Sequence, residues 1–132
     1  MAHPPEQWKK DLKESIESIE ELSQHFPLME NREELEALVK QYPMRITPYL
    51  LNLMKEKGDS ISRQVIPSLE EGQMTSACMD DPLAEGHDSP VPNLVHRYPD
   101  RVLLYLTSQC PVYCRFCTRK RFVGEPGFIP KG

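Results

Sequence analysis

The sequence of 132 residues predicts an α/β fold in which helices come first and a strand follows a proline-rich segment. Three observations support this prediction. Apolar residues recur at helical spacing in the N-terminal half, prolines interrupt residues 67–100, and an apolar run of strand length covers residues 101–107. We therefore predict a helical region over 1–66, an extended linker over 67–100 and a third region over 101–132 that begins with the strand.

The helical region is expected to contain three helices and a short helical turn. An amphipathic pattern predicts the first over about residues 6–24, followed by Pro27. The second begins at Asn31, which with Glu34 matches a capping box, and ends before Pro43. The third begins at Thr47-Pro48 and ends at Gly58, and a short turn is expected over 60–66. The first helix is expected to serve in packing or in a homo-oligomer contact, and not in catalysis.

The apolar run over residues 101–107 is typical of a strand that is buried on both faces, as the first strand of a β/α barrel would be. It is the only convincing strand in the sequence. Active sites of β/α barrels lie at the carboxyl ends of their strands. The residues that follow the strand are therefore the expected site of chemistry.

Three cysteines follow this strand at C-x3-C-x2-C spacing, namely Cys110, Cys114 and Cys117. Three thiolates can ligate three irons of a [4Fe-4S] cluster and leave the fourth iron open to a small molecule. A zinc site would require a fourth Cys or His, and none follows; a redox dithiol would leave Cys110 unexplained. Cys78 stands apart from the three and is expected to be an incidental or buried thiol.

The segment Cys114-Arg-Phe-Cys117-Thr-Arg-Lys-Arg-Phe, with His96-Arg-Tyr-Pro-Asp-Arg101 and Asp81-Pro-Leu-Ala-Glu85 before it, resembles the lysine 2,3-aminomutase family of radical S-adenosylmethionine (SAM) enzymes. The resemblance implies the N-terminal portion of an isomerase. Its fold would be a helical region that leads into the first strand and cluster loop of a partial TIM-type (radical SAM) barrel, truncated. Since the remaining strands would be missing, 132 residues alone are expected to be inactive.

The resemblance also implies that Cys110, Cys114 and Cys117 hold the [4Fe-4S] cluster and that SAM binds its open iron. An electron donor such as ferredoxin or flavodoxin would then allow SAM cleavage to a 5′-deoxyadenosyl radical. Phe116 matches the aromatic position beside the SAM adenine, where lysine aminomutases often have His. The alternative for Phe116 is a plain packing role.

A second cofactor, pyridoxal phosphate (PLP), is implied by the same resemblance, with its lysine outside this chain. Tyr98 and Arg101 match residues around PLP, and His96 and Arg97 are assigned to the same wall. Arg119 matches the arginine that holds the substrate α-carboxylate. For the basic group Arg115, Arg119, Lys120 and Arg121, the alternative is a solvated basic face or a nucleic-acid patch.

The formal net charge of −4 argues against a general nucleic-acid surface. No apolar run approaches the roughly 18 residues that span a membrane, and no secretory signal precedes the helices, so a cytoplasmic location is expected. The substrate would be a free amino acid such as lysine. The alternatives are a related enzyme that makes β-lysine for a translation factor and, from another class, a non-catalytic iron–sulfur or zinc binding module.

Overall fold

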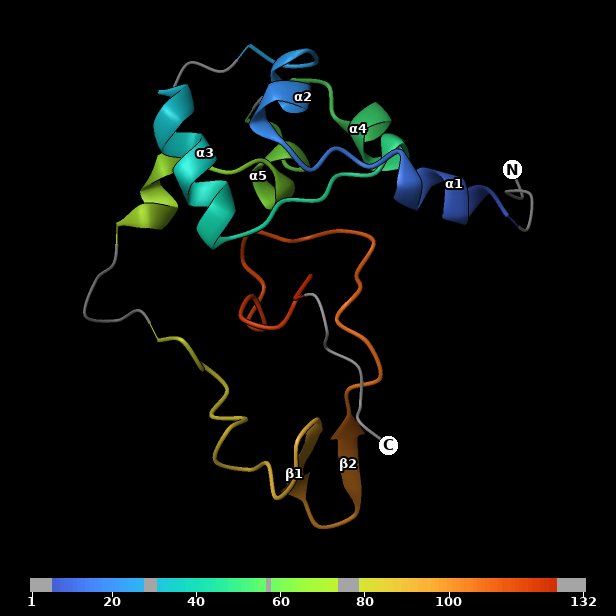
Figure 1. The fold of residues 1–132 in the computed structure, drawn as a ribbon, viewed down its shortest axis with the longest axis vertical. Helices are drawn as coiled ribbons and strands as arrows, with labels where there is room; N and C mark the ends of the chain where they lie inside the picture. Colours follow the sequence, from blue (N-terminus) through green and yellow to red (C-terminus); the bar gives the residue numbers. More distant parts are fainter. Residues whose placement is uncertain (1–5, 28–30, 57, 74–78, 126–132) are drawn as a thin grey trace. The chain divides into compact units, whose positions relative to one another are not determined.

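The structure is a computed structural model that describes residues 6–27, 31–56, 58–73 and 79–125 (Figure 1). The chain divides into two compact units. The first unit consists of Met1–Gln73 and Pro111–Cys117, and the second of Met74–Cys110 and Thr118–Gly132. The cysteine segment is therefore shared between the units, with Cys110 in the second and Cys114 and Cys117 in the first. The predicted division at residues 66 and 100 stays a prediction.

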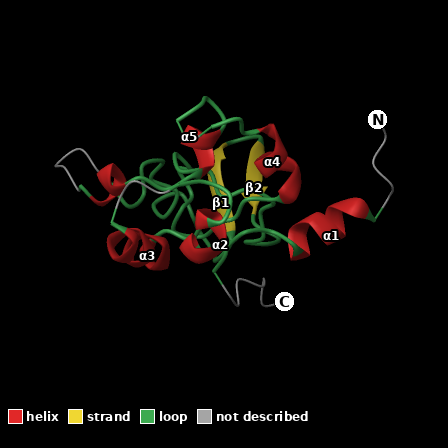
Figure 2. Ribbon diagram, turned by 90° about the horizontal axis from the view of Figure 1, so that it is seen from above, coloured by secondary structure: helices red, strands yellow, loops and turns green. Residues whose placement is uncertain are grey.

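The first unit is helical (Figures 1 and 2). Its described elements are α1 Gln7–Lys13, α2 Ile19–Ser23, α3 Arg32–Gln41, α4 Pro48–Leu53, α5 Ser62–Val65 and the 3-10 helix η1 Leu69–Gly72. None of the helices in the described part of the chain is long and apolar enough to cross a bilayer.

The prediction of one continuous helix over residues 6–24 is wrong in its middle. The chain leaves the helix after α1, and Ile16 forms an antiparallel bridge with Ile46, with N–O distances of 2.9 and 3.0 Å. Ser18 then starts α2 with a capping box, since its side chain accepts from the Glu21 N–H while the Glu21 carboxylate accepts from the Ser18 N–H. The sequence predicted one helix because the helical spacing of its apolar residues continues through this break.

The other helix starts agree with the sequence. Asn31 caps α3 by accepting from the Glu33 N–H at 3.0 Å, and its amide also donates to Glu34, so the pair is linked without a full capping box. Thr47 caps α4 with Pro48 at the first position. α4 ends at Leu53, before the predicted Gly58.

A loop built on one carboxylate follows α4 and leads into α5. The Asp59 carboxylate accepts backbone N–H groups of Ser62 at 2.7 Å and Lys55 at 2.8 Å. These bonds, led by that of Ser62, lower the pKa of Asp59 to about 2. The predicted turn over 60–66 is confirmed as α5 in its shorter bounds, Ser62–Val65.

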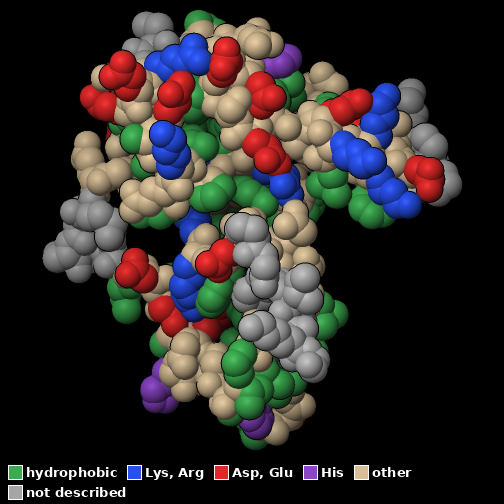
Figure 3. Space-filling view, in the orientation of Figure 1, with side chains coloured by type: hydrophobic (Ala, Val, Ile, Leu, Met, Phe, Trp, Pro, Cys, Tyr) green, Lys and Arg blue, Asp and Glu red, His purple; other side chains and the backbone are tan. Residues whose placement is uncertain are grey.

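The core of the first unit lies between α2, α3, α5 and the segment after α3. Its most buried side chains include Ile19, Leu22, Leu35, Met44, Ile46 and Val65. Outside this core the charges of both signs are mixed, as Figure 3 shows in blue and red. Arg32, for example, lies 2.9 Å from Glu36 and 3.8 Å from Glu20.

The second unit contains a hairpin of β1 Leu94–Tyr98 and β2 Arg101–Leu104. The strands are antiparallel, with Leu94 opposite Leu104, Val95 opposite Leu103 and Tyr98 opposite Arg101, and the register is irregular between Val95 and Tyr98. β1 was not expected, because its sequence Leu-Val-His-Arg-Tyr lies in the predicted linker and has two polar residues. η1 also lies in that segment.

The predicted strand over residues 101–107 is confirmed only as far as Leu104, and the prediction that it is buried on both faces is wrong for this chain. All four β2 residues are exposed, including Val102 at 52% and Leu104 at 51%. The reason is that β2 pairs with β1 alone in the described chain, so that nothing covers its apolar side chains as a further sheet layer would.

We expect Leu22→Ala to destabilise the first unit by about 2–5 kcal/mol, because Leu22 has no exposed surface and its removal leaves a cavity among α2 and α3. Urea unfolding followed by circular dichroism measures the change. Leu53→Ala on α4 is the matched control, since Leu53 is 43% exposed and should cost only about 0.5 kcal/mol. Equal losses for the two variants would contradict this position of the core.

Candidate functional site

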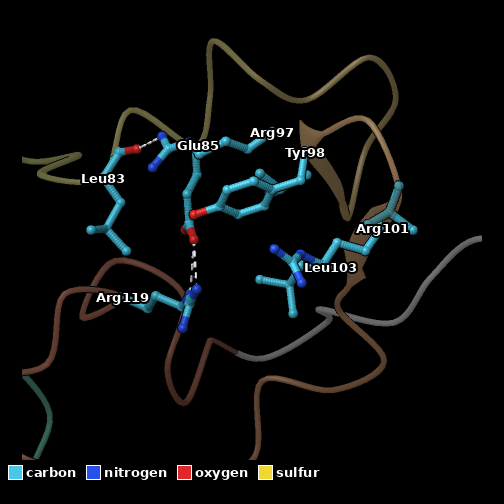
Figure 4. A pocket seen from close by; sticks show the side chains of 9 residues that line it. Leu83, Glu85, Arg97, Tyr98, Arg101, Leu103 and Arg119 are labelled. Atoms are coloured by element: carbon cyan, nitrogen blue, oxygen red, sulfur yellow. Dashed lines mark hydrogen bonds and ion pairs between the residues drawn. The ribbon is translucent and has the colours of Figure 1, made fainter.

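A pocket of about 380 Å³ in the second unit brings together most of the site residues predicted there (Figure 4). Its walls come from the hairpin, from the loop before it and from the turn that follows the cysteines. The lining residues are Leu83, Glu85, Val95, Arg97, Tyr98, Arg101, Val102, Leu103 and Arg119. Tyr98, Arg101 and Arg119, which the resemblance assigns to PLP and to the substrate carboxylate, therefore share one cavity.

Glu85 is the acidic residue in the lining of this pocket, and it is only 4% exposed. The Arg119 guanidinium donates to its Oε1 from Nη2 at 2.7 Å and from Nε at 3.0 Å. The Tyr105 hydroxyl donates to its Oε2 at 2.6 Å. Arg119 Nε also donates to the Tyr105 oxygen at 2.8 Å, so the three side chains form a closed network.

A tight turn holds Glu85 in place. The Asp81 carboxylate accepts the Gly86 N–H at 2.8 Å and the Glu85 N–H at 3.1 Å. Ala84 takes a positive φ of 50° in this turn, a conformation that costs energy for a side chain with a Cβ. The Gly86 N–H, together with that of Glu85 and with Arg121, lowers the pKa of Asp81 despite partial desolvation.

Two basic residues of this segment, Arg115 between the cysteines and Arg121 after them, have their partners inside the protein. Arg121 lies 2.7 Å from Asp81 and 3.7 Å from Glu85, and it also donates to the Asp80 carbonyl oxygen at 3.0 Å. Arg115 is buried in the first unit at 8% exposure. The alternative of a solvated basic face is therefore wrong for Arg115 and Arg121.

The ionisation of the network follows from its contacts. Burial raises the pKa of Glu85, but the hydrogen bonds from Arg119 and Tyr105 and the charges of Arg119 and Arg121 outweigh it, so the net shift is downward. The hydrogen bond to Glu85 raises the pKa of Arg119. Burial, and then Glu85, raises the pKa of Tyr105. The network thus contains a carboxylate, a guanidinium and a neutral phenol at neutral pH.

The hairpin contributes two further arginines that differ in their surroundings. Arg97 donates to Asp88 at 2.7 Å and to the Leu83 carbonyl oxygen. The Arg101 guanidinium lies 4.6 Å from the centre of the Tyr98 ring, and its side chain is 68% exposed, with Asp100 at 3.7 Å. Arg101 is therefore the pocket arginine that is best placed to meet an incoming anion.

The cysteines meet the chemical requirement of an iron site in type and number. Cys110, Cys114 and Cys117 are half-buried and form no disulfide. Thiolates are soft ligands that suit iron–sulfur clusters. Within residues 6–27, 31–56, 58–73 and 79–125, no three His, Cys, Asp or Glu side chains are already grouped as a metal site. Cys78 lies outside the described residues.

Phe116 and His96 lie outside the pocket. Phe116 stands between Cys114 and Cys117 in the first unit and is 68% exposed. His96 is on β1, where its N–H donates to the Asp88 carbonyl oxygen at 2.8 Å.

Two members of the network, Glu85 and Tyr105, had no predicted role. Glu85 appeared only within the segment Asp81–Glu85, and Tyr105 was assigned to the buried strand. One signal for Glu85 was available: the three acidic residues at 81, 85 and 88 equal in number the three arginines at 97, 119 and 121. Charge balance does not identify which pairs form.

The sequence was compared with known proteins, and no protein-family model matches it. Among curated proteins it is similar to L-lysine 2,3-aminomutase of Clostridium subterminale, with 46% identity over 121 residues, covering 89% of this chain and 29% of that protein. It is 41% identical to L-lysine 2,3-aminomutase of Bacillus subtilis over 97% of this chain and 29% of the relative. Glutamate 2,3-aminomutase of Clostridioides difficile is 31% identical over 89% of this chain and 28% of its own length. The chain thus spans less than a third of the length of each of these three relatives.

We expect Glu85→Gln to lower the stability of the second unit by about 1–3 kcal/mol at pH 7, because Arg119 loses its charged partner. Since the folded-state pKa of Glu85 is lowered, its contribution is present above the unfolded value near 4.3 and is lost as the pH falls through the folded value. The difference between wild type and variant in urea unfolding should therefore shrink below about pH 4.

Glu56→Gln, at an exposed residue, is the control and should change stability little at any pH. A difference between wild type and Glu85→Gln that stays constant from pH 7 to pH 3 would contradict the ionic role of Glu85.

Proposed function

Because the chain belongs to the lysine 2,3-aminomutase family, we propose that it is the N-terminal portion of a radical SAM, PLP-dependent amino acid 2,3-aminomutase. The observation that supports this most is the pocket in which Tyr98, Arg101 and Arg119 come together. The reaction would be a 1,2-amino shift, an isomerisation. The substrate class is a free amino acid, in keeping with relatives that are named for lysine and for glutamate.

The proposed fold of the whole protein is a TIM-type barrel in which β2 is the first strand. The exposed apolar side chains of β2, Val102, Leu103 and Leu104, support this proposal, since a strand with such residues on both faces is normally covered by neighbours. The cysteines lie in the loop that follows β2, which is where β/α barrels place their active sites.

Cys110, Cys114 and Cys117 are proposed to hold three irons of a [4Fe-4S] cluster. When bound, the cluster and SAM together supply the radical that starts the reaction. The protein contributes three thiolates and, beside them, the exposed Phe116 ring, which we propose packs against the SAM adenine. An electron donor such as ferredoxin or flavodoxin is part of the proposal.

In the pocket, Tyr98 and Arg101 are proposed to contact PLP, with Arg101 as the anion contact. PLP, when bound, supplies the group through which the substrate nitrogen migrates. Arg119 is proposed to bind the substrate carboxylate, and its guanidinium is already oriented by Glu85 and Tyr105. The pocket thus offers two cationic groups, Arg101 for an anionic group of PLP and Arg119 for the substrate carboxylate.

The remaining partners and the location are proposals too. The helical region is proposed to serve packing or a homo-oligomer contact. We propose a cytoplasmic protein that binds neither nucleic acid nor membranes.

Replacing Cys110, Cys114 or Cys117 with Ala is expected to abolish cluster binding, because each thiolate ligates a different iron. Iron and sulfide analysis and the visible absorption spectrum of the full-length protein after anaerobic reconstitution measure this. Cys78→Ala is the control and should retain the cluster. Full iron content in the Cys114→Ala variant would contradict the proposal, as would a wild-type spectrum that SAM does not change.

In the whole protein, Arg119→Lys should reduce kcat/KM for the amino acid by about 100-fold or more, since lysine keeps the charge but loses the planar fork that binds a carboxylate. Iron content should be unchanged in this variant. Lys120→Ala is the control at the neighbouring position and should have a much smaller effect. Turnover by Arg119→Lys at the wild-type rate would remove Arg119 from the site.

A further inference from the structure

Arg115 stands between Cys114 and Cys117 in the sequence, and it is the buried charge of the first unit that lies nearest to them in the chain. It is 8% exposed, whereas the neighbouring Phe116 is 68% exposed. Residues Pro111–Cys117 belong to the same compact unit as the helices. A guanidinium in such a position needs acceptors for its donors, because burying a charge without partners is costly.

The helical region provides those acceptors. The Glu71 carboxylate of η1 accepts from Arg115 Nη2 at 2.8 Å and from Nε at 2.9 and 3.0 Å. Arg115 Nη1 donates to the carbonyl oxygens of Pro43 at 3.1 Å and Tyr42 at 3.2 Å. Tyr42 is the residue that ends α3, so Arg115 joins η1 to the carboxyl end of that helix.

The backbone around Arg115 is attached to the same unit. The Arg115 N–H donates to the Gln64 carbonyl oxygen in α5 at 2.7 Å, and the Tyr113 N–H donates to the Arg45 carbonyl oxygen at 3.3 Å. The Tyr113 ring is 6% exposed, with the Arg45 guanidinium 4.8 Å from its centre. Cys114 therefore lies between two residues whose backbone is fixed.

Cys117 is connected to Cys114 by one turn, since its N–H donates to the Cys114 carbonyl oxygen at 3.1 Å. A loop that is ordered before its ligand arrives loses less conformational entropy on binding than a loop that is mobile. Residues that orient metal ligands without touching the metal typically contribute a factor of about 10 to 100 to the metal affinity. The helical region is in this way connected to the cysteine segment through the Arg115–Glu71 pair and through the backbone hydrogen bonds of Arg115 and Tyr113.

We propose that Arg115 and Glu71 are a positioning pair that presents Cys114 and Cys117 to the cluster. The inference rests on the proposed function, because it needs a cluster bound by these thiolates. It assigns the helical region a second role, besides packing: part of it sets the affinity of a metal site whose ligands lie more than forty residues further along the chain. Neither residue touches iron or substrate, and both act through the cysteine backbone.

The test uses two variants. Arg115→Lys keeps the charge but replaces the planar guanidinium with one nitrogen, so the two-nitrogen contact with Glu71 is lost. Glu71→Gln keeps the shape but loses the charge. Each variant is reconstituted anaerobically with iron and sulfide. Iron retention is then measured in competition with a chelator, and the reduced cluster is examined by electron paramagnetic resonance. Arg63→Lys is the matched control, because Arg63 is exposed and lines the same surface hollow as Arg115 and Glu71.

Both variants should hold iron about 10- to 100-fold more weakly than wild type and give an altered resonance signal, while Arg63→Lys should match wild type. The double variant should be no weaker than the worse single variant, because the two residues act as one pair. A role in folding alone would lower the melting temperature without moving the resonance signal.

The outcomes separate the two proposals. If wild type binds a cluster and both variants retain it with the same affinity and signal, the positioning role is wrong and the proposed function stands. If wild type takes up no cluster, the proposed function and the positioning role both fall. Should Arg115→Lys not fold by circular dichroism, Glu71→Gln alone decides, since it leaves every donor of Arg115 in place.

Discussion

A guanidinium that is removed from water needs hydrogen-bond acceptors within the protein. The segment after β2 contains three guanidinium groups that are wholly or partly removed from water. Arg115 is bound by Glu71 in the first unit, and Arg119 and Arg121 are bound by Glu85 and Asp81 in the second. Each carboxylate precedes the arginine that it binds by 34 residues or more, so each pair joins two segments that are distant in the sequence. Each pair is charge-assisted, and the Glu71 and Glu85 pairs use two nitrogens of one guanidinium, which fixes direction as well as distance.

These pairs explain why a strongly basic stretch of sequence does not produce a basic surface. Arg115, Arg119 and Arg121 would together attract phosphate if they projected into solvent. Each charge is instead offset by a nearby carboxylate, and these ion pairs help to hold loops that have little regular structure. Glu85 is the clearest case, because the turn around it contains a strained Ala84 and is held by hydrogen bonds to Asp81.

The sequence predicted those parts of the structure that depend on local chemistry. Asn31, Thr47 and Pro48 mark helix starts because a cap acts within three residues of itself.

The sequence-based predictions were wrong where a residue that is distant in the chain determines the local structure. Ile16 leaves the helix to pair with Ile46, and β1 exists because β2 lies opposite, and neither pairing is visible in a local pattern. In the pocket, the resemblance identified Tyr98, Arg101 and Arg119. It did not identify Glu85, whose carboxylate orients Arg119. An acidic residue in a proline-rich stretch of sequence is normally expected to lie in a solvated linker.

The Glu85 network also bears on how a pocket with this much charge could bind a small anion selectively. A free arginine side chain loses about 2 kcal/mol of rotamer entropy when it is immobilised, which weakens any ligand that must immobilise it. Arg119 has already been ordered during folding by Glu85 and Tyr105, so a carboxylate that binds it as proposed does not bear that cost. The same network limits the net charge of the site, because Glu85 offsets one of its arginines. An anion entering the pocket thus meets a surplus of positive charge that lies mainly at Arg101, beside the Tyr98 ring, and a guanidinium at Arg119 whose orientation is fixed before the ligand arrives.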